Sequence, residues 1–254
     1  MKKAFKLIGM VVLAVLVLLG GAALYFNLKG VPTYDTHPPQ DLKVEVTPER
    51  VARGKKIAAS LCNSCHLSEA GKLEGKLFLK GTEGFGTGYA PNITQHPEHG
   101  IGSWTDGELY YLLRTGIKRD GKLAFIAMPR SSVVSDEDYY SIIAYLRSDA
   151  PEVQPSAKKH PPLKLNLLAK VLMNVAFKPL PFPESPVVAP PLTDAVAHGR
   201  YLVNGPLECF NCHSADFTTN DIARPENSKG YLQGGTVFIE HGDTLVSPNI
   251  TMDP

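Results

Sequence analysis

The strongest constraint on this chain of 254 residues is a short cysteine motif that occurs twice. Residues 62–66 read Cys-Asn-Ser-Cys-His, residues 209–213 read Cys-Phe-Asn-Cys-His, and together the two motifs hold all four cysteines. A C-x-x-C-H sequence is the attachment signature of c-type haem, in which two thiols bind the porphyrin and the adjacent histidine ligates the iron. We therefore predict two covalently bound haems c. The predicted attachment and ligand residues are Cys62, Cys65 and His66 for the first, and Cys209, Cys212 and His213 for the second.

Three other uses of four cysteines fit this pattern less well. A structural zinc site normally needs two C-x-x-C pairs within a few tens of residues, whereas these pairs lie 147 residues apart. A thioredoxin-like dithiol needs a βαβ context, which the sequence shows around neither pair. Two disulfides would suit an exported chain, but they would leave both adjacent histidines unexplained.

The N-terminus predicts export to an oxidising compartment. Residues 7–26 carry no charge and are long enough to cross a hydrocarbon core of about 30 Å as a helix. Three lysines precede this segment, so the positive-inside rule leaves the short tail in the cytoplasm and places the remaining chain on the periplasmic side of the inner membrane. Residues 1–30 are thus expected to form a retained anchor, with a signal peptide cleaved near Gly21 and Ala23 as the alternative.

Sequence near each cysteine motif is repeated as well. The sequence Pro-Asn-Ile-Thr occurs at residues 91–94 and again at residues 248–251. It follows the first cysteine of its motif by 29 residues in the first copy and by 39 in the second, so the second copy carries about ten extra residues in this loop. Two copies of one module explain this better than two unrelated sites.

Helix signals follow the same order around the motifs. Thr47 precedes a proline and predicts a helix that ends near Cys62, and Thr193 is expected to open the matching helix before Cys209. In the first copy, the sequence Thr-Asp-Gly-Glu at residues 105–108 predicts a capping box, followed by an apolar face and a glycine stop. A last helix is expected after Ser135, with four inward-facing residues: Tyr139, Ile142, Ile143 and Leu146.

One methionine is a candidate second ligand of the first haem iron. Met128 is the only methionine between Cys62 and Asp149, and it lies in a loop before Pro129 rather than on an apolar helical face. Methionine and histidine together saturate haem iron in electron-transfer cytochromes. The other interpretation is that Met128 fills a gap in the core.

Charge and proline content limit the partners and the organisation. The chain has 26 basic and 25 acidic residues, a balance that argues against nucleic acid as a partner. Residues 151–191 contain ten prolines and predict an extended linker. Within it, residues 163–177 could form an amphipathic helix that is too short to span a bilayer. Packing on the two haem domains and docking on a partner or a membrane surface are both open for this helix.

The order of these parts resembles the class I cytochrome c fold. More narrowly, the Pro-Asn-Ile-Thr sequence, Gly-Ile-Gly-Ser-Trp at residues 100–104, Asp120-Gly121 and Met128-Pro129 resemble the multihaem cytochrome subunits of membrane-bound bacterial alcohol and gluconate dehydrogenases. The resemblance covers residues 45–254 and implies His66 and Met128 as ligands of the first haem, with a backbone carbonyl near Pro91 that orients His66. It also implies a carrier that takes electrons from a dehydrogenase partner and passes them to a quinone pool or an oxidase.

These observations predict a mainly α protein with an N-terminal transmembrane helix and two cytochrome c-like domains, the second truncated. The expected boundaries are residues 1–30 for the anchor, 43–150 for domain 1, 151–191 for the linker and 192–254 for domain 2. The repeat places the methionine ligand of the second haem near position 285, so the sequence is expected to be part of a longer diheme protein. Met252 and His241 are the weaker ligand candidates that the sequence contains.

The expected function is electron transfer rather than catalysis. Saturated iron favours electron transfer over binding of oxygen or peroxide, and the sequence shows no catalytic base, nucleophile or substrate pocket beside the motifs. We therefore predict a membrane-anchored diheme cytochrome that passes electrons from a dehydrogenase to the respiratory chain on the periplasmic side. A diheme peroxidase-like enzyme and a cytochrome domain that feeds a terminal oxidase are the alternatives.

Overall fold

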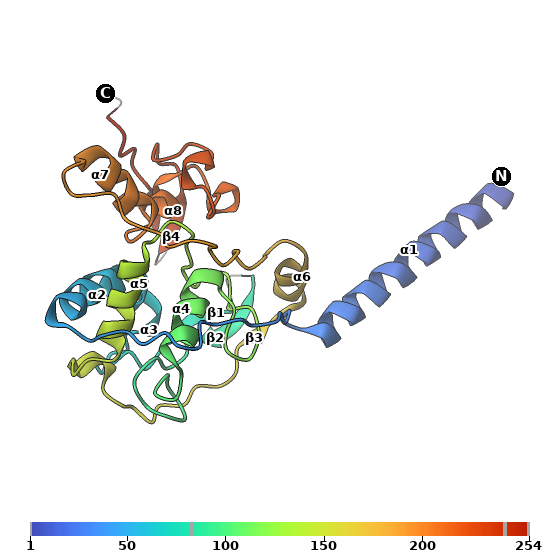
Figure 1. Cartoon of the computed structure of the whole chain (residues 1–254). Coiled ribbons are helices and arrows are strands. Elements are labelled where there is room, and N and C mark those ends of the chain that lie inside the picture. Colours follow the sequence, from blue (N-terminus) through green and yellow to red (C-terminus); the bar gives the residue numbers. More distant parts are fainter. Residues whose placement is uncertain (1, 82–83, 241–242, 253–254) are drawn as a thin grey trace.

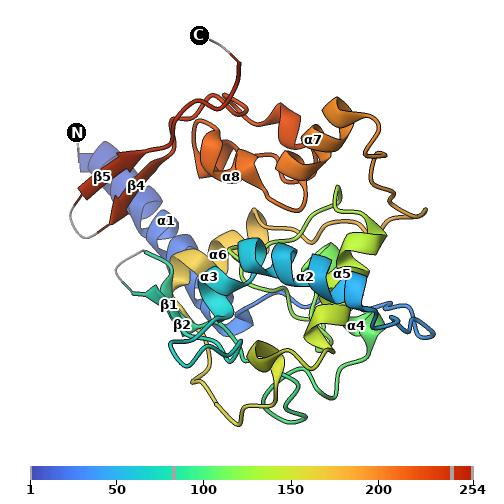
Figure 2. The same cartoon turned by 90° about the vertical axis from the view of Figure 1, so that its left-hand side faces the viewer.

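The computed structural model describes residues 2–81, 84–240 and 243–252. Within these residues the fold is mainly helical, with two small antiparallel sheets. A long N-terminal helix extends away from a body in which one group of helices lies above another (Figures 1 and 2). The prediction of a mainly α protein is confirmed in this form, whereas the two sheets were not predicted.

The N-terminal helix α1 (Lys2–Lys29) is continuous and has no buried residue. Its most apolar window has a mean hydropathy of 2.8, and α1 is the one helix among the described residues that is long and apolar enough to cross a membrane. A helix that is apolar on all sides and leaves most of its length uncovered is suited to lipid rather than to water. The predicted apolar N-terminal helix is therefore confirmed as a helix that could span a membrane.

Four helices form the first module: α2 (Pro48–Leu61), α3 (Asn63–His66), α4 (Asp106–Thr115) and α5 (Asp136–Leu146). The predicted N-caps are confirmed, because Thr47 accepts a hydrogen bond from a first-turn backbone N–H and Ser135 does the same for α5. Thr105 and Glu108 form the predicted capping box, in which each side chain accepts from the backbone N–H of the other residue. Gly116 then ends α4 with a φ of 80°, a left-handed conformation that glycine adopts without strain.

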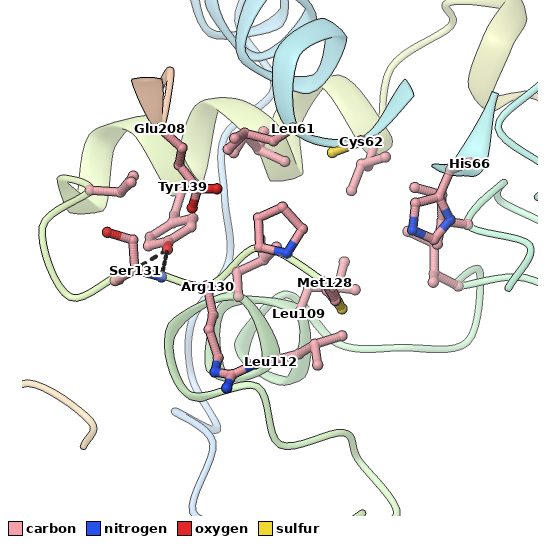
Figure 3. Close-up of a pocket in the computed structure, with 17 residues that line it drawn as sticks. Leu61, Cys62, His66, Leu109, Leu112, Met128, Arg130, Ser131, Tyr139 and Glu208 are labelled. Atoms are coloured by element: carbon pink, nitrogen blue, oxygen red, sulfur yellow. Dashed lines mark hydrogen bonds between the residues drawn. The ribbon is translucent and has the colours of Figure 1, made fainter. Parts of the chain in front are cut away.

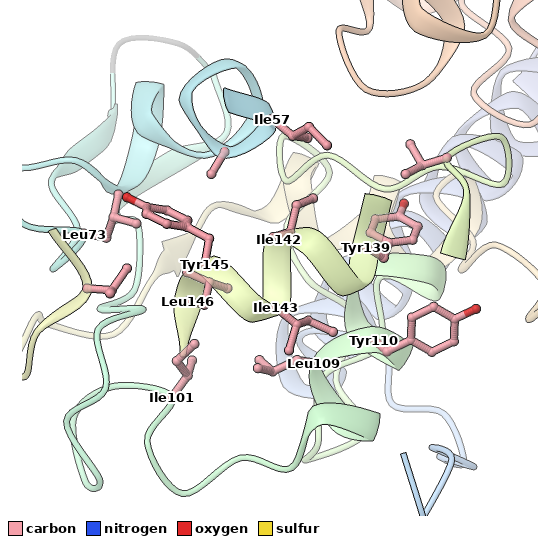
Figure 4. Close-up of a cluster of buried hydrophobic side chains, with 13 residues drawn as sticks. Ile57, Leu73, Ile101, Leu109, Tyr110, Tyr139, Ile142, Ile143, Tyr145 and Leu146 are labelled. Atoms are coloured by element: carbon pink, nitrogen blue, oxygen red, sulfur yellow. The ribbon is translucent and has the colours of Figure 1, made fainter. Parts of the chain in front are cut away.

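The core of the first module is built where α2 crosses α5 (Figure 4). Its buried apolar residues come from both helices, from α4 and from the loops around them: Ile57, Ala58, Leu73, Ile101, Leu109, Tyr110, Val134, Tyr139, Ile142, Ile143, Tyr145, Leu146 and Val153. All four residues predicted to face inward from the last helix belong to this cluster. The crossing is close at Gly54, where an added Cβ would lie 1.8 Å from the backbone oxygen of Ser141.

A small sheet lies beside this core, and it includes two residues that were predicted to belong to the linker helix. The strands β1 (Leu77–Lys80), β2 (Gly86–Tyr89) and β3 (Lys164–Leu165) pair in that order and run antiparallel. The predicted helix at residues 163–177 is therefore too long. The observed helix α6 (Leu167–Val175) begins after Asn166, whose side chain accepts a hydrogen bond from Ala169 N, while the preceding two residues pair with β2.

The second module follows the linker and repeats the first in part. It contains helices α7 (Ala195–Asn204) and α8 (Cys209–His213), the 3₁₀ turns η2 (Phe217–Thr219) and η3 (Pro225–Asn227), and the hairpin β4 (Val237–Glu240) and β5 (Asp243–Val246). The prediction that Thr193 opens the first helix is wrong, because the side chain of Asp194 accepts the hydrogen bond from Ala197 N. The candidate ligand His241 lies outside the described residues.

The two modules are in direct contact through a buried tyrosine. Tyr201 of α7 is 5% exposed, and its hydroxyl lies 3.0 Å from both the backbone nitrogen and Oγ of Ser135, at the start of α5. The same hydroxyl contacts the carboxylate of Asp138, which also pairs with Arg53. Because the tyrosine reaches the N-terminus of α5, the second module is fixed beside the helix that bounds the first core.

Candidate functional site: two haem-attachment segments on a shared scaffold

The first cysteine motif opens onto an apolar cavity between α2, α4 and α5. The cavity contains about 720 Å³ of space that no protein atom fills, part of it open to solvent. Its lining brings together three residues predicted from the sequence: Cys62, His66 and Met128. Figure 3 shows the His66 ring and the Met128 side chain entering this space from different elements. Cys65 lies on α3 next to His66 but is not among the lining residues.

Apolar side chains surround these three residues. They come from α2, α4, α5 and the loops that precede α4 and α5: Leu61, Ile93, Ile101, Leu109, Leu112, Leu113, Val134, Ile142 and Leu146. The face predicted for the helix after residue 105 is thus directed at this cavity rather than at the compact core alone. A lining of this composition suits a flat, mainly apolar ligand.

Backbone contacts fix the protonation of His66. Its Nδ1 lies 2.8 Å from the carbonyl oxygen of Pro91, the contact that the resemblance implied. A carbonyl oxygen only accepts hydrogen bonds, so Nδ1 carries the proton and Nε2 keeps a free lone pair. Burial lowers the pKa of His66, which keeps the ring neutral. A neutral imidazole with a free Nε2 beside the cavity is ready to bind a metal.

The second motif is held by contacts equivalent to those of the first. His213 Nδ1 lies 2.9 Å from the carbonyl oxygen of Pro248, which occupies the position of Pro91 in the repeat. In each copy the asparagine after this proline accepts hydrogen bonds from the backbone nitrogen and Oγ1 of the threonine two residues later. The structure therefore brings Cys209, Cys212 and His213 together on α8 and orients the histidine as in the first copy.

Two glycines that the sequence analysis did not single out complete this scaffold. Gly75 N donates to the carbonyl oxygen of His66, and Gly234 N donates to that of His213, both at 2.8 Å. Each has a positive φ, and an added Cβ would lie 2.1 Å from Ala90 O at Gly75 and 2.4 Å from Ser247 O at Gly234. The signal for both was a glycine two residues after a leucine, downstream of each motif. The extra residues of the second copy lie between His213 and Gly234, where η2 and η3 form.

The pKa values of the thiols argue against the alternative of a redox-active dithiol. Loss of hydration raises the pKa of Cys62 to about 12, and burial also raises the pKa of Cys209 and of Cys212. A nucleophilic dithiol needs the opposite shift. The four cysteines are all described, and none is in a disulfide.

Two charged residues at the cavity were missed from the sequence. Arg130 is 5% exposed, and its Nε and Nη1 have no hydrogen-bond partner. Burial lowers the pKa of Arg130, while the negative charge of Glu208 opposes this shift. Glu208 belongs to the second module, precedes Cys209 directly and lines the first cavity (Figure 3). Burial raises the pKa of Glu208 to about 7. No local sequence pattern predicts that Arg130 and Glu208 line the same cavity, because this depends on how the two modules pack.

These features fit a haem c in the first cavity. The space is apolar, one histidine nitrogen is free, a thiol and a thioether face the same volume, and the unpartnered guanidinium of Arg130 can pair with an anionic group such as a propionate. The second site fits in its attachment residues, whereas Met252 is fully exposed at 101%.

Comparison with known proteins identifies the class of the first module. Residues 49–146 match the family described as cytochrome c oxidase, cbb3-type, subunit III. The first module is therefore a c-type cytochrome domain, the class of protein for which covalently bound haem is expected.

More particular relatives cover both modules. The chain is 33% identical over 218 residues to the cytochrome c subunit of the quinone-type alcohol dehydrogenase of Gluconobacter oxydans, an alignment that spans 79% of this chain and 42% of the relative. It is 31% identical over 193 residues to a diheme cytochrome c-type protein of Cereibacter sphaeroides, over 72% of this chain and 62% of the relative. It is 30% identical over 205 residues to the cytochrome c subunit of the gluconate 2-dehydrogenase of Pantoea cypripedii, over 75% of this chain and 44% of the relative.

These matches confirm the resemblance to cytochrome c subunits of bacterial dehydrogenases. They also support an electron-transfer role in place of catalysis by the chain itself, since the matched dehydrogenase proteins include several that are named as cytochrome subunits. The chain spans less than two thirds of the length of each of these relatives.

Proposed function

We propose that this chain is a membrane-anchored diheme c-type cytochrome that transfers electrons on the periplasmic side of the inner membrane. In this proposal it receives electrons from a dehydrogenase partner and passes them towards the respiratory chain. The partner class rests on the relatives, several of which are named as cytochrome subunits of alcohol, fructose and gluconate dehydrogenases.

One observation carries the proposal of two haems. Both C-x-x-C-H motifs lie on short helices, and in both the Nδ1 atom of the histidine faces a proline carbonyl oxygen, at 2.8 Å for His66 and 2.9 Å for His213. This contact has no use in a structural disulfide, and it prepares the other ring nitrogen for a metal. The same preparation in two copies supports the same cofactor in both.

In the first module the residues have separate tasks. Cys62 and Cys65 would bind the haem covalently, and His66 and Met128 would ligate its iron. When bound, the haem supplies a one-electron iron couple. The apolar lining from α2, α4 and α5 would shield the bound haem from much of the solvent, and Met128 as a second ligand would compete with oxygen or peroxide for the iron.

The cysteine motifs give the first test. The full chain would be produced in a host that attaches haem c, and its haem content would be measured as the pyridine haemochrome per mole of protein. We expect two haems in the wild type and one in each double variant, Cys62→Ala with Cys65→Ala or Cys209→Ala with Cys212→Ala. A wild type without Soret absorption would overturn the proposal.

The ligand residue gives the second test. Met128→Ala should lose the methionine-to-iron absorption band of the first haem and keep both haems attached. Met173→Ala, at a buried methionine of α6, is the matched control and should keep the band. Peroxide turnover by the wild type, with an open iron position, would favour the peroxidase alternative instead.

A further inference from the structure

A short apolar helix lies at the point where the N-terminal helix meets the body of the protein. Lys170 Nζ of α6 donates to Asn27 Oδ1 at 2.6 Å, and Asn174 Nδ2 donates to Gly30 O at 2.8 Å. Both acceptors belong to the last turn of α1 or the residue after it. Figure 1 shows α6 beside this end of α1.

The position of α6 relative to a bilayer follows from the length of α1. The uncharged segment at residues 7–26 is about 30 Å long as a helix, which matches the hydrocarbon core. Asn27 therefore comes at the boundary between hydrocarbon and headgroups. Because Lys170 is bonded to Asn27, α6 lies at the depth of the headgroups when α1 spans the bilayer.

One face of α6 is apolar and uncovered. Leu168 is 55% exposed and Val175 is 61% exposed, and they lie seven residues apart on the same helical face with the partly exposed Leu172 between them. The opposite face is fixed to the protein, since Ala169 and Met173 are buried. An uncovered apolar face on a helix with one polar side is typical of helices that lie in the membrane interface.

The charge around α6 fits an anionic surface. Residues 153–183 contain five lysines and no aspartate or glutamate, although the whole chain is nearly neutral. Lys164 and Lys178 flank the helix on either side and are exposed. Basic residues next to a membrane span are attracted to anionic phospholipid headgroups.

We propose that α6 is a membrane-surface helix, whose Leu168–Val175 face enters the interface of an anionic bilayer while the flanking lysines contact lipid headgroups. This inference rests on the retained anchor of the proposed function. It adds a second attachment point, because α6 is continuous with β3 and is thereby bonded to the sheet of the first module. Two attachments fix the orientation of the first cavity relative to the membrane.

The test measures side-chain accessibility in the full, haem-loaded chain. The protein would be placed in nanodiscs that contain phosphatidylglycerol and phosphatidylcholine, and hydroxyl-radical oxidation would be quantified residue by residue with mass spectrometry. The end of the linker and the residue after it supply matched controls of the same residue types: Leu192, 80% exposed, for Leu168, and Val188, 81% exposed, for Val175. We expect Leu168 and Val175 to be oxidised at least five-fold more slowly than their controls.

Each other outcome has a defined meaning. Rates within two-fold of the controls are what the exposed fractions alone would give, and they would overturn the proposal. Equal protection in nanodiscs of phosphatidylcholine alone would overturn the role of the lysines. Protection found only in native membrane vesicles would assign the face to a protein partner and overturn the lipid role. The intact mass and haem content of the same sample report anchor retention and haem loading separately, so a failure here is distinct from failure of the proposed function.

Discussion

The close crossing of α2 and α5 makes a sharp prediction for Gly54→Ala. The added methyl group would lie 1.8 Å from Ser141 O and 2.4 Å from Ser141 C, both of them backbone atoms of α5. A carbon and a carbonyl oxygen normally stay about 3.3–3.6 Å apart. The two helices must therefore separate by about 1.5 Å, because neither contact can be relieved by rotating a side chain.

The cost of that separation can be set against the helix propensity of alanine. Overpacking of a core costs about 1–3 kcal/mol, and a backbone clash belongs at the upper end. The gain from replacing a helical glycine is about 1 kcal/mol at most. We expect a net loss of about 2 kcal/mol, which corresponds to a fall in Tm of about 4–8 °C for a protein of this size.

The matched control is Gly199→Ala in α7. Gly199 precedes the second cysteine motif as Gly54 precedes the first, but a Cβ there meets no atom within 4 Å. This variant should keep or slightly raise Tm. Thermal unfolding of both variants would be followed by circular dichroism at 222 nm in the same detergent. A Gly54→Ala protein as stable as Gly199→Ala would show that the two helices do not cross as closely as described.

Three further predictions concern residues at the contact between the modules or at the first cavity. Tyr201→Phe removes the hydroxyl that reaches Ser135 and Asp138, so it should lower the free energy of unfolding by about 1–3 kcal/mol in chemical denaturation. Arg130→Gln removes a buried positive charge beside the first cavity and should lower the midpoint potential of a haem held there by tens of millivolts, on the order expected at a dielectric constant of about 20. A redox titration that gives the wild-type value for Arg130→Gln, or the Arg130→Gln value for Arg130→Lys, would refute this. Glu208 has a folded pKa raised to about 7, so wild-type stability relative to Glu208→Gln should be greatest below pH 4.5 and fall as the pH rises to 7; parallel stability curves across this range would contradict it.

Local patterns in the sequence were sufficient to predict the main helices of the first module. Its caps at Thr47, Thr105 and Ser135 act on neighbouring backbone groups, so they depend little on the rest of the chain. The contact between His66 and the carbonyl of Pro91 was expected from the resemblance to class I cytochromes c. The attachment roles of the four cysteines and the ligand roles of His66, Met128 and His213 stay predictions, as do the domain boundaries.

What the sequence did not predict depends on contacts between distant segments. The strand β3 exists because residues 164–165 find an open edge on β2, and no periodicity in two residues can indicate that. Thr193 and Asp194 are both residue types that cap helices well, so the residue type alone does not predict that Asp194 is the N-cap of α7. Arg130 and Glu208 line the same cavity because the two modules pack together, through contacts such as that of Tyr201 with Ser135.

The placement of Glu208 has a consequence for the rate of electron transfer within the protein. The residue that precedes the second attachment cysteine lines the first cavity, so two cofactors loaded on these segments would be neighbours within one chain. An electron could then tunnel between them over a fixed distance within the chain. This step would need no diffusional encounter between two proteins. Internal transfer would be independent of protein concentration and viscosity, and dilution would slow only the exchange with outside partners.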